Sequence, residues 1–313
     1  MHLYTSSFNK FTIALLSTFA VLTMLFIGLT EYLIRTQVIP NHNFLHYLKI
    51  FKTSQEVNAS FGDSIMANGF SGGPNFLNLS MGGDNFAGMA TKVRLYYKDK
   101  KPGKVILEAG LHHISSHHMF HRDNGDGFID TLHSGGTPLF NVFNPTFRYE
   151  IFTYWRIVFA QGKFVPLEKY GEYGARLRNE NYAKYPVYLR KSGANQTAKM
   201  WEPVANPSES KTIKQMQELV NFIKEKGGEV CLLTFPVSGD VAKATKDNQH
   251  FTDARKAFAK LAAENNIVYL DMYDKELTDN NFADFTHLNK NGAKTVSQSI
   301  VKGCGFYQLA DGF

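Results

Sequence analysis

Cysteine is scarce in this 313-residue chain, which contains only Cys231 and Cys304. Two cysteines cannot build the multi-disulfide framework that stabilises many small secreted domains. Cys231 lies in the apolar run 230–235, where a free cysteine usually packs as a small hydrophobic side chain. We expect that role for Cys231, and cysteine usage leaves the redox compartment of the protein undecided.

The sequence also lacks internal repeats and nucleic-acid-binding motifs. Its basic residues are dispersed along the chain, although they give a formal net charge of +6 at pH 7. This charge favours anionic envelope surfaces, and no nucleic-acid partner is predicted. With 43% hydrophobic and 20% charged residues, the chain can form one large or two small globular domains.

Charge is absent from residues 11–30, which are mostly apolar. About 20 such residues form a helix long enough to cross a hydrocarbon core of ~30 Å. A cleaved signal peptide would have a shorter apolar region, followed by a small-residue site of the Ala-x-Ala type. No such site occurs at residues 31–35. The sequence therefore predicts that residues 1–35 form an uncleaved, single-pass membrane anchor.

The positive charges around this span do not agree with an external domain. Lys10 and the free amine precede the span, whereas Arg35, Lys49 and Lys52 follow it. Counted by the positive-inside rule, these charges mildly favour a cytoplasmic location for the rest of the chain. Residues 36–54 are expected to be a tether, and their amphipathic part, 44–51, could lie on the bilayer surface.

Residues 55–313 are predicted to form an α/β domain. Strand-like apolar runs lie near 55–61, 76–80, 104–110, 229–235 and 267–271. Between and after them come helical patterns near 86–98, 209–226, 252–265 and 290–302. Strands that alternate with helices form a parallel sheet covered on both faces, which is a three-layer α/β/α sandwich.

An aromatic-rich insertion at about 115–208 interrupts this alternation. Fifteen of the 43 aromatic residues of the chain fall between Phe140 and Trp201, so the segment is too apolar for a disordered linker. We expect it to cover the C-terminal edge of the sheet. Its aromatic side chains could bind sugar rings, contact a membrane or a membrane partner, or fill a core within the insertion.

Two short motifs carry candidate chemistry. Gly62-Asp63-Ser64 follows a predicted strand, which would place a serine hydroxyl at the C-terminal edge of the sheet, where open α/β sheets bind ligands. A serine nucleophile needs a base and a group that orients the base. Asp284 and His287 are three residues apart and supply both near the end of the chain.

These motifs resemble those of the SGNH, or GDSL-type, hydrolases, a family of esterases, deacetylases and acyltransferases with a flavodoxin-like sheet. The resemblance implies that Ser64 is the nucleophile, His287 the base and Asp284 its orienting partner. Residues 78–84 resemble the second block of the family, in which Gly83 matches an oxyanion-hole glycine. The third block departs from the family, because His112 occupies the place of the usual oxyanion-hole asparagine.

Other residues near these motifs have alternative interpretations. Asp63 and His113 are predicted to contact substrate. Gly-Asp-Ser chemistry needs no metal or cofactor, and we predict neither, although His113, His117 and His121 would share one face of a helix at a metal-binding spacing. Residues 123–127 resemble a calcium loop but lack its ligand spacing, which favours a turn. Ser71 lies in a Gly-x-Ser-x-Gly pattern without the flanking strand and helix that would make it a nucleophile.

The resemblance implies a function at the cell envelope. Anchored relatives acetylate exopolysaccharides such as alginate, or serve D-alanylation of teichoic acid, commonly beside a multi-spanning membrane O-acyltransferase. We therefore expect an O-acyl, most simply acetyl, transferase or esterase on an envelope polysaccharide. The domain would face the periplasm or cell exterior from the inner membrane. The alternatives are a non-catalytic glycan-binding or scaffolding subunit, and a lipase or lysophospholipase.

Overall fold

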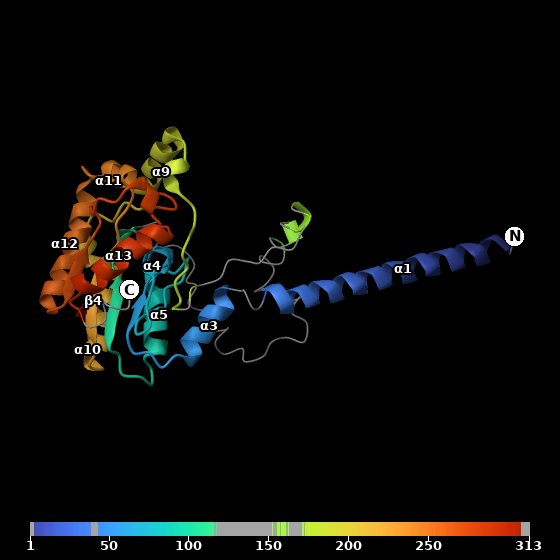
Figure 1. Cartoon of the computed structure of the whole chain (residues 1–313), viewed down its shortest axis with the longest axis horizontal. Coiled ribbons are helices and arrows are strands. Elements are labelled where there is room, and N and C mark those ends of the chain that lie inside the picture. Colours follow the sequence, from blue (N-terminus) through green and yellow to red (C-terminus); the bar gives the residue numbers. More distant parts are fainter. Residues whose placement is uncertain are drawn as a thin grey trace. The chain divides into compact units, whose positions relative to one another are not determined.

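The computed structural model describes residues 3–38, 43–115 and 173–307, and also residues 117, 152, 155, 156, 158–160, 162 and 171. The chain divides into two compact units, residues 1–46 with 134–169, and residues 47–133 with 170–313. Figure 1 traces the whole chain, and each unit is described separately below.

The first unit contains a long N-terminal helix, α1 (Leu3–Leu33), which continues into the π-helical turn η1 (Ile34–Val38). Residues 10–36 are long and apolar enough to cross a membrane, by length and composition. Within the same unit, Phe26 of α1 stacks on Trp155 with ring centroids 5.7 Å apart, and Trp155 stacks on Phe159 at 5.5 Å. Trp155 of the insertion therefore lies against the apolar helix.

The second unit contains a five-stranded parallel sheet with strand order β2-β1-β3-β4-β5. This order confirms the predicted α/β class, and it is the doubly wound order in which the chain changes direction between β1 and β3. Ligands bind such sheets outside the carboxyl ends of these two strands. The strands are β1 (Ala59–Phe61), β2 (Leu77–Asn78), β3 (Lys104–Glu108), β4 (Glu229–Thr234) and β5 (Val268–Asp271).

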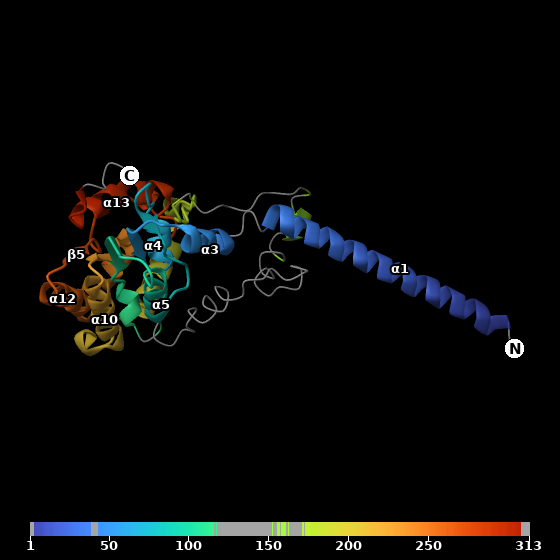
Figure 2. The same ribbon diagram turned by 90° about the horizontal axis from the view of Figure 1, so that it is seen from below.

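Helices cover both faces of this sheet. On one face α5 packs on β1, α10 on β4 and α12 on β5, while on the other α4 packs against α13. Figure 2 shows α13 on one side and α5, α10 and α12 on the other. Among the described residues after β1, the helices are α4 (Ser64–Gly69), α5 (Phe86–Tyr96), α9 (Val187–Met200), α10 (Lys211–Glu225), α11 (Gly239–Thr245), α12 (Gln249–Glu264) and α13 (Lys290–Gly303). The 3-10 turns there are η2 (Leu111–Ile114), η5 (Tyr182–Lys184), η6 (Pro207–Glu209) and η7 (Asp279–Asn281).

Helix α10 illustrates why the predicted elements form. The Ser210 hydroxyl accepts a hydrogen bond from the Ile213 N–H at 3.2 Å and caps its first turn. Buried apolar residues then recur three or four positions apart on the face toward the sheet. Gly227 ends the helix with a φ of +82°, a conformation that glycine adopts without strain.

The amphipathic segment before the domain packs on protein. It forms α3 (Asn43–Thr53), in which Tyr47 and Phe51 are buried. The Tyr47 hydroxyl donates a hydrogen bond to the Leu79 carbonyl at 2.8 Å, and the Phe51 ring lies 5.2 Å from that of Tyr96. The expectation that this stretch lies on a bilayer is therefore wrong, because its apolar face is used in the second unit.

The two cysteines form a disulfide. Cys231 in β4 and Cys304 after α13 are both buried, with Cα atoms 5.6 Å apart. The expectation of a free, packed Cys231 is corrected. The sequence could not predict this pairing, because it depends on α13 packing on the face of the sheet to which the Cys231 side chain points. No local pattern reports such a contact.

Candidate active site

The candidate nucleophile is held in a tight turn between β1 and α4. A side chain at Gly62 would overlap the Glu108 carboxyl, so only glycine lets the chain pass there. The Asp63 carboxylate accepts a hydrogen bond from the Ile65 N–H at 2.7 Å and caps α4. Ser64 is the first helical residue, and its half-buried side chain stands at the carboxyl end of β1.

Three side chains form a chain of hydrogen bonds at this edge. Ser64 Oγ lies 2.8 Å from His287 Nε2. On the other side of the ring, His287 Nδ1 lies 2.9 Å from both carboxylate oxygens of Asp284. The two ends of the sequence thus meet in the serine, base and carboxylate arrangement used for nucleophilic catalysis.

The Asp284 carboxylate is held ionised. Burial opposes ionisation, but hydrogen bonds and charge interaction with the His287 ring hold the pKa of Asp284 well below its usual range. The backbone N–H groups of Thr286 and His287 also donate to Asp284 Oδ1, at 3.1 and 2.9 Å. A fixed negative charge beside Nδ1 orients the imidazole and favours the protonated ring that forms when it accepts a proton.

Arg178 is a member of the site that the sequence analysis did not find. Its guanidinium lies 2.5 Å from Asp284 Oδ2 and 3.1 Å from Glu180 Oε1. The Arg178 carbonyl also accepts a hydrogen bond from the Lys290 N–H at 2.8 Å. Arg178 belongs to the predicted insertion, and no local spacing links it to Asp284, about a hundred residues later in the chain.

A second, buried polar network lies beneath the nucleophile turn. Asp63 Oδ2 is 2.7 Å from His112 Nε2, and the Glu108 carboxylate accepts a hydrogen bond from the Asp63 N–H at 2.8 Å. Burial and the neighbouring Asp63 charge raise the pKa of Glu108 well above its ordinary value. Burial opposes ionisation of Asp63, but its interactions with His112 hold the pKa of Asp63 well below its usual range. The network therefore places a carboxyl whose ionised form is favoured, that of Asp63, beside one whose ionisation is opposed, that of Glu108.

The side chains of this network are of types that also bind metal ions. Asp63, Glu108, His112 and His113 are all buried and offer ligand atoms within 4.8 Å of one another. Hydrogen bonds already join Asp63 to His112 and to the turn that carries Ser64, so these bonds explain the cluster as a support for the nucleophile. The serine chemistry of the neighbouring triad requires no metal ion.

The oxyanion-hole and substrate residues predicted from sequence have different surroundings. Gly83 is exposed and has a φ of +84°, which fits a glycine turn after β2. His112 is buried and its Nε2 is engaged with Asp63, so that atom does not serve as an oxyanion donor in this arrangement. Asp63 and His113 are also buried. The roles of Gly83, His112, Asp63 and His113 in binding remain predictions.

The other sequence candidates lie away from the triad or outside the described residues. The Ser71 hydroxyl lies 3.0 Å from Ser297 Oγ in α13. His117 is exposed, whereas His118, His121 and His133, residues 123–127 and about half of the aromatic-rich insertion lie outside the described residues.

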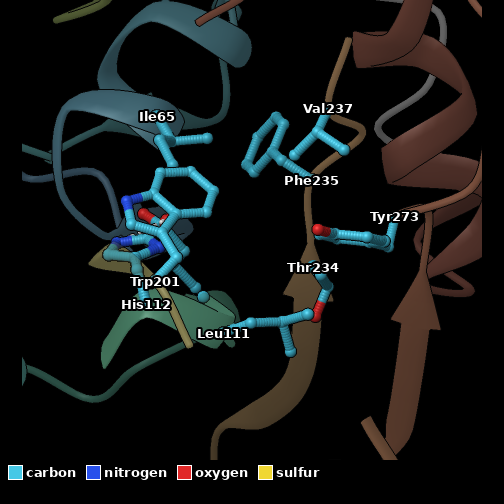
Figure 3. A pocket seen from close by; sticks show the side chains of 10 residues that line it. Ile65, Leu111, His112, Trp201, Thr234, Phe235, Val237 and Tyr273 are labelled. Atoms are coloured by element: carbon cyan, nitrogen blue, oxygen red, sulfur yellow. Dashed lines mark ion pairs between the residues drawn. The ribbon is translucent and has the colours of Figure 1, made fainter. Parts of the chain in front are cut away.

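A small apolar pocket lies next to the nucleophile turn. Its volume is about 10 Å³, and Ile65, the residue after Ser64, contributes to its wall. Figure 3 shows Trp201 beside His112 on one side, with Phe235, Val237 and Tyr273 across from them. The ring centroids of Trp201 and His112 are 4.7 Å apart. A pocket of this size holds about one water-sized group.

A larger cavity of about 460 Å³ shares Val237 and Tyr273 with the small pocket. It lies between the start of α11 and the chain that follows β5, and is lined by Gly239, Ala242 and residues 274–278. Its volume falls within the range of small-molecule binding sites. The edge of the sheet thus offers a narrow apolar space and a wider one whose wall also includes charged side chains such as Asp274, Lys275 and Glu276.

The chain was also compared with known proteins. No protein-family model matches its sequence, and no curated protein matches it. Among solved structures, a proposed acylhydrolase from Bacteroides fragilis has 11% identity and a TM-score of 0.41, over 85% of this chain and 98% of its own. A structure described as TesA has 10% identity and a TM-score of 0.40, over 78% and 96%. A lipase/acylhydrolase from Enterococcus faecalis has 11% identity and a TM-score of 0.37, over 81% and 96%. Because these identities and TM-scores are low, the function is inferred from the geometry of the site itself.

Proposed function

We propose that this chain is a membrane-anchored serine esterase or acyltransferase of the SGNH type, which adds or removes O-acetyl groups on a cell-envelope polysaccharide. The observation that carries the proposal is the hydrogen-bonded series from Ser64 Oγ to His287 Nε2 and from His287 Nδ1 to Asp284. A purely scaffolding or glycan-binding subunit has no need for all three groups in this geometry.

The proposed reaction has two acyl-transfer steps. In the first, His287 accepts the Ser64 proton while Oγ attacks the ester carbonyl, and Asp284 stabilises the protonated ring. The protonated His287 then gives its proton to the departing alcohol, leaving an acyl-enzyme on Ser64. N–H groups at Ser64 and Gly83 are the proposed donors to the oxyanion, and each such donor typically contributes ~3 kcal/mol to transition-state stabilisation.

The second step decides between hydrolysis and transfer. Either water or a sugar hydroxyl gives its proton to His287 and attacks the acyl carbon of the acyl-enzyme. The bond from that carbon to Ser64 Oγ then breaks, His287 returns the proton to Oγ, and acetate or an acetylated sugar is released. The small pocket next to Ile65, about 10 Å³, supports a short acyl group over the long chain of a lipase substrate. The adjoining cavity of about 460 Å³ is a candidate site for a sugar unit.

The proposed location is the outer side of the cytoplasmic membrane. The apolar helix at residues 10–36 supports a single-pass anchor. The Cys231–Cys304 disulfide supports an oxidising compartment, since cytosolic proteins rarely keep structural disulfides. The disulfide therefore favours the outer side, whereas the positive charges around the span favour the cytoplasmic side. A multi-spanning membrane O-acyltransferase is the proposed partner that would supply or receive the acyl group.

Two assays test the proposal. Purified full-length protein in detergent should hydrolyse 4-nitrophenyl acetate much faster than the palmitate ester, and Ser64→Ala should remove the activity. Ser71→Ala is the matched control, because it removes a hydroxyl from the same region without touching the triad. In cells, Ser64→Ala should change the O-acetyl content of the envelope polysaccharide.

The outcomes separate the alternatives. A preference for the palmitate ester would favour a lipase. Unchanged polysaccharide acetylation in cells that carry Ser64→Ala would contradict the envelope role, and esterase activity that survives this substitution would contradict the acyl-enzyme.

A further inference from the structure

The segment 173–178 is fixed over the active-site edge of the sheet by its own backbone. Three hydrogen bonds, each 2.8 Å long, tie it to three different elements of the α/β unit. They run from the Asn78 N–H to the Tyr173 carbonyl, from the Arg176 N–H to the Ala67 carbonyl, and from the Lys290 N–H to the Arg178 carbonyl. Two arginine side chains, at positions 176 and 178, are therefore held at defined places near the triad.

Arg176 lies on the Ser64 side of the site. A Cβ atom built on Gly82 would stand 3.5 Å from Ser64 Cβ and 4.0 Å from Arg176 Nη1. The same point in space is thus close to both the nucleophile and the guanidinium. Because residue 82 is a glycine, it places no side chain of its own between them. A group attached to an ester at Ser64 would meet this guanidinium.

The guanidinium of Arg176 has different surroundings from those of three other arginines in the second unit. Arg178, Arg190 and Arg255 each form ion pairs with two carboxylates. Arg176 is exposed, and within the described part of the chain no carboxylate lies within ion-pair distance of it. Its positive charge is consequently available to a ligand at the entrance to the site.

We propose that Arg176 binds a negatively charged group, a carboxylate or a phosphate, on the ester substrate or acyl acceptor of Ser64. The planar guanidinium suits these groups because it can donate two parallel hydrogen bonds to their oxygens. This inference rests on the proposed acyl-ester chemistry at Ser64 and narrows its substrate class to anionic glycans. Arg178 cannot take the same role, since its guanidinium is committed to Asp284 and Glu180.

A matched set of aryl acetates tests the inference. The set is 4-acetoxybenzoate, 4-acetoxyphenyl phosphate and the neutral methyl 4-acetoxybenzoate, which carry the same acyl group with different remote charges. Full-length wild type, Arg176→Gln and Arg176→Lys would be compared in detergent at low salt. Arg94→Gln is the control, because it removes one exposed positive charge from the last turn of α5.

Arg176→Gln should lower kcat/KM for at least one anionic ester about tenfold or more, as expected for loss of a charge-assisted hydrogen bond, and leave the neutral ester unchanged. Arg176→Lys should recover part of the loss, and the carboxylate and phosphate arms show which group is preferred. An equal loss on neutral and anionic esters, or no loss on either anionic ester, would overturn the inference. Arg94→Gln should match wild type.

Binding measurements separate this inference from the proposed chemistry. Calorimetry with 4-hydroxybenzoate, inorganic phosphate and methyl 4-hydroxybenzoate reads the anion site without turnover. At least one of the two anions should bind wild type more tightly than Arg176→Gln, and added salt should weaken this difference by screening. Equal affinities would overturn the anion site even if ester hydrolysis is observed. Absence of hydrolysis with a clear difference in anion affinity would instead contradict only the proposed reaction.

Discussion

Removing the Cys231–Cys304 disulfide should lower the free energy of unfolding of the second unit by about 4 kcal/mol. The bond closes a loop with a sequence separation of 73 residues, and the chain-entropy relation gives about 4 kcal/mol for a loop of that length. Both Asp284 and His287 lie inside this loop, so the same bond restrains the two triad residues that are distant from Ser64 in the sequence. For a domain of this size the midpoint of thermal unfolding should fall by about 10 °C.

The assay compares wild type with the Cys231→Ala/Cys304→Ala variant in thermal and urea unfolding, each with and without reductant. Wild type with reductant should behave like the variant, and reductant should not affect the variant. Alkylation of the unfolded protein taken directly from cells reports whether the bond forms in place. Identical stabilities, or two free thiols in cells, would refute the reasoning about both the loop and the oxidising compartment.

Three further predictions follow from buried groups and from the triad. Glu108→Gln should stabilise the protein increasingly as pH rises above about 4.5, because the unfolded chain releases the Glu108 proton near that pH while the buried carboxyl keeps it. Urea unfolding at several pH values measures this effect, and a constant difference from wild type would contradict it. Lys92→Ala should cost about 3–5 kcal/mol, because it leaves the buried Asp84 charge without its 2.5 Å ion pair. Adding Asp84→Asn should recover most of that loss in thermal unfolding, and no recovery would be the contrary result. Ser64→Ala with His287→Ala should be about as inactive toward acetyl esters as either change alone, since both groups act in one step. Multiplied losses would show that they act independently.

The sequence predicts the α/β layout well where local signals agree. The helix expected at 209–226 is observed as Lys211–Glu225, because a serine cap, apolar periodicity and a terminal glycine all mark its bounds. The strand expected at 104–110 is observed as Lys104–Glu108, with a continuous buried run. Short helices such as α4 and α11, six and seven residues long, were not predicted because so few residues carry little periodicity.

Contacts between distant segments could not be read from the sequence. The amphipathic pattern of α3 reports an apolar face but does not distinguish a bilayer from a protein surface. The pairing of Cys231 with Cys304, and of Arg178 with Asp284, depends on how α13 and the segment after Gly171 return to the sheet. The sequence alone links Ser64 to Asp284 and His287 for a chemical reason. A serine nucleophile needs a base to accept its proton and a carboxylate to orient that base.

The most direct test of the central claim is covalent labelling of the nucleophile. Full-length protein treated with a fluorophosphonate probe, digested and analysed by peptide mass should carry the probe on Ser64. Ser64→Ala should remain unlabelled, His287→Ala should label far more slowly, and Ser71→Ala should label as wild type does. Equal labelling of Ser64→Ala and wild type would contradict an acyl-enzyme on Ser64.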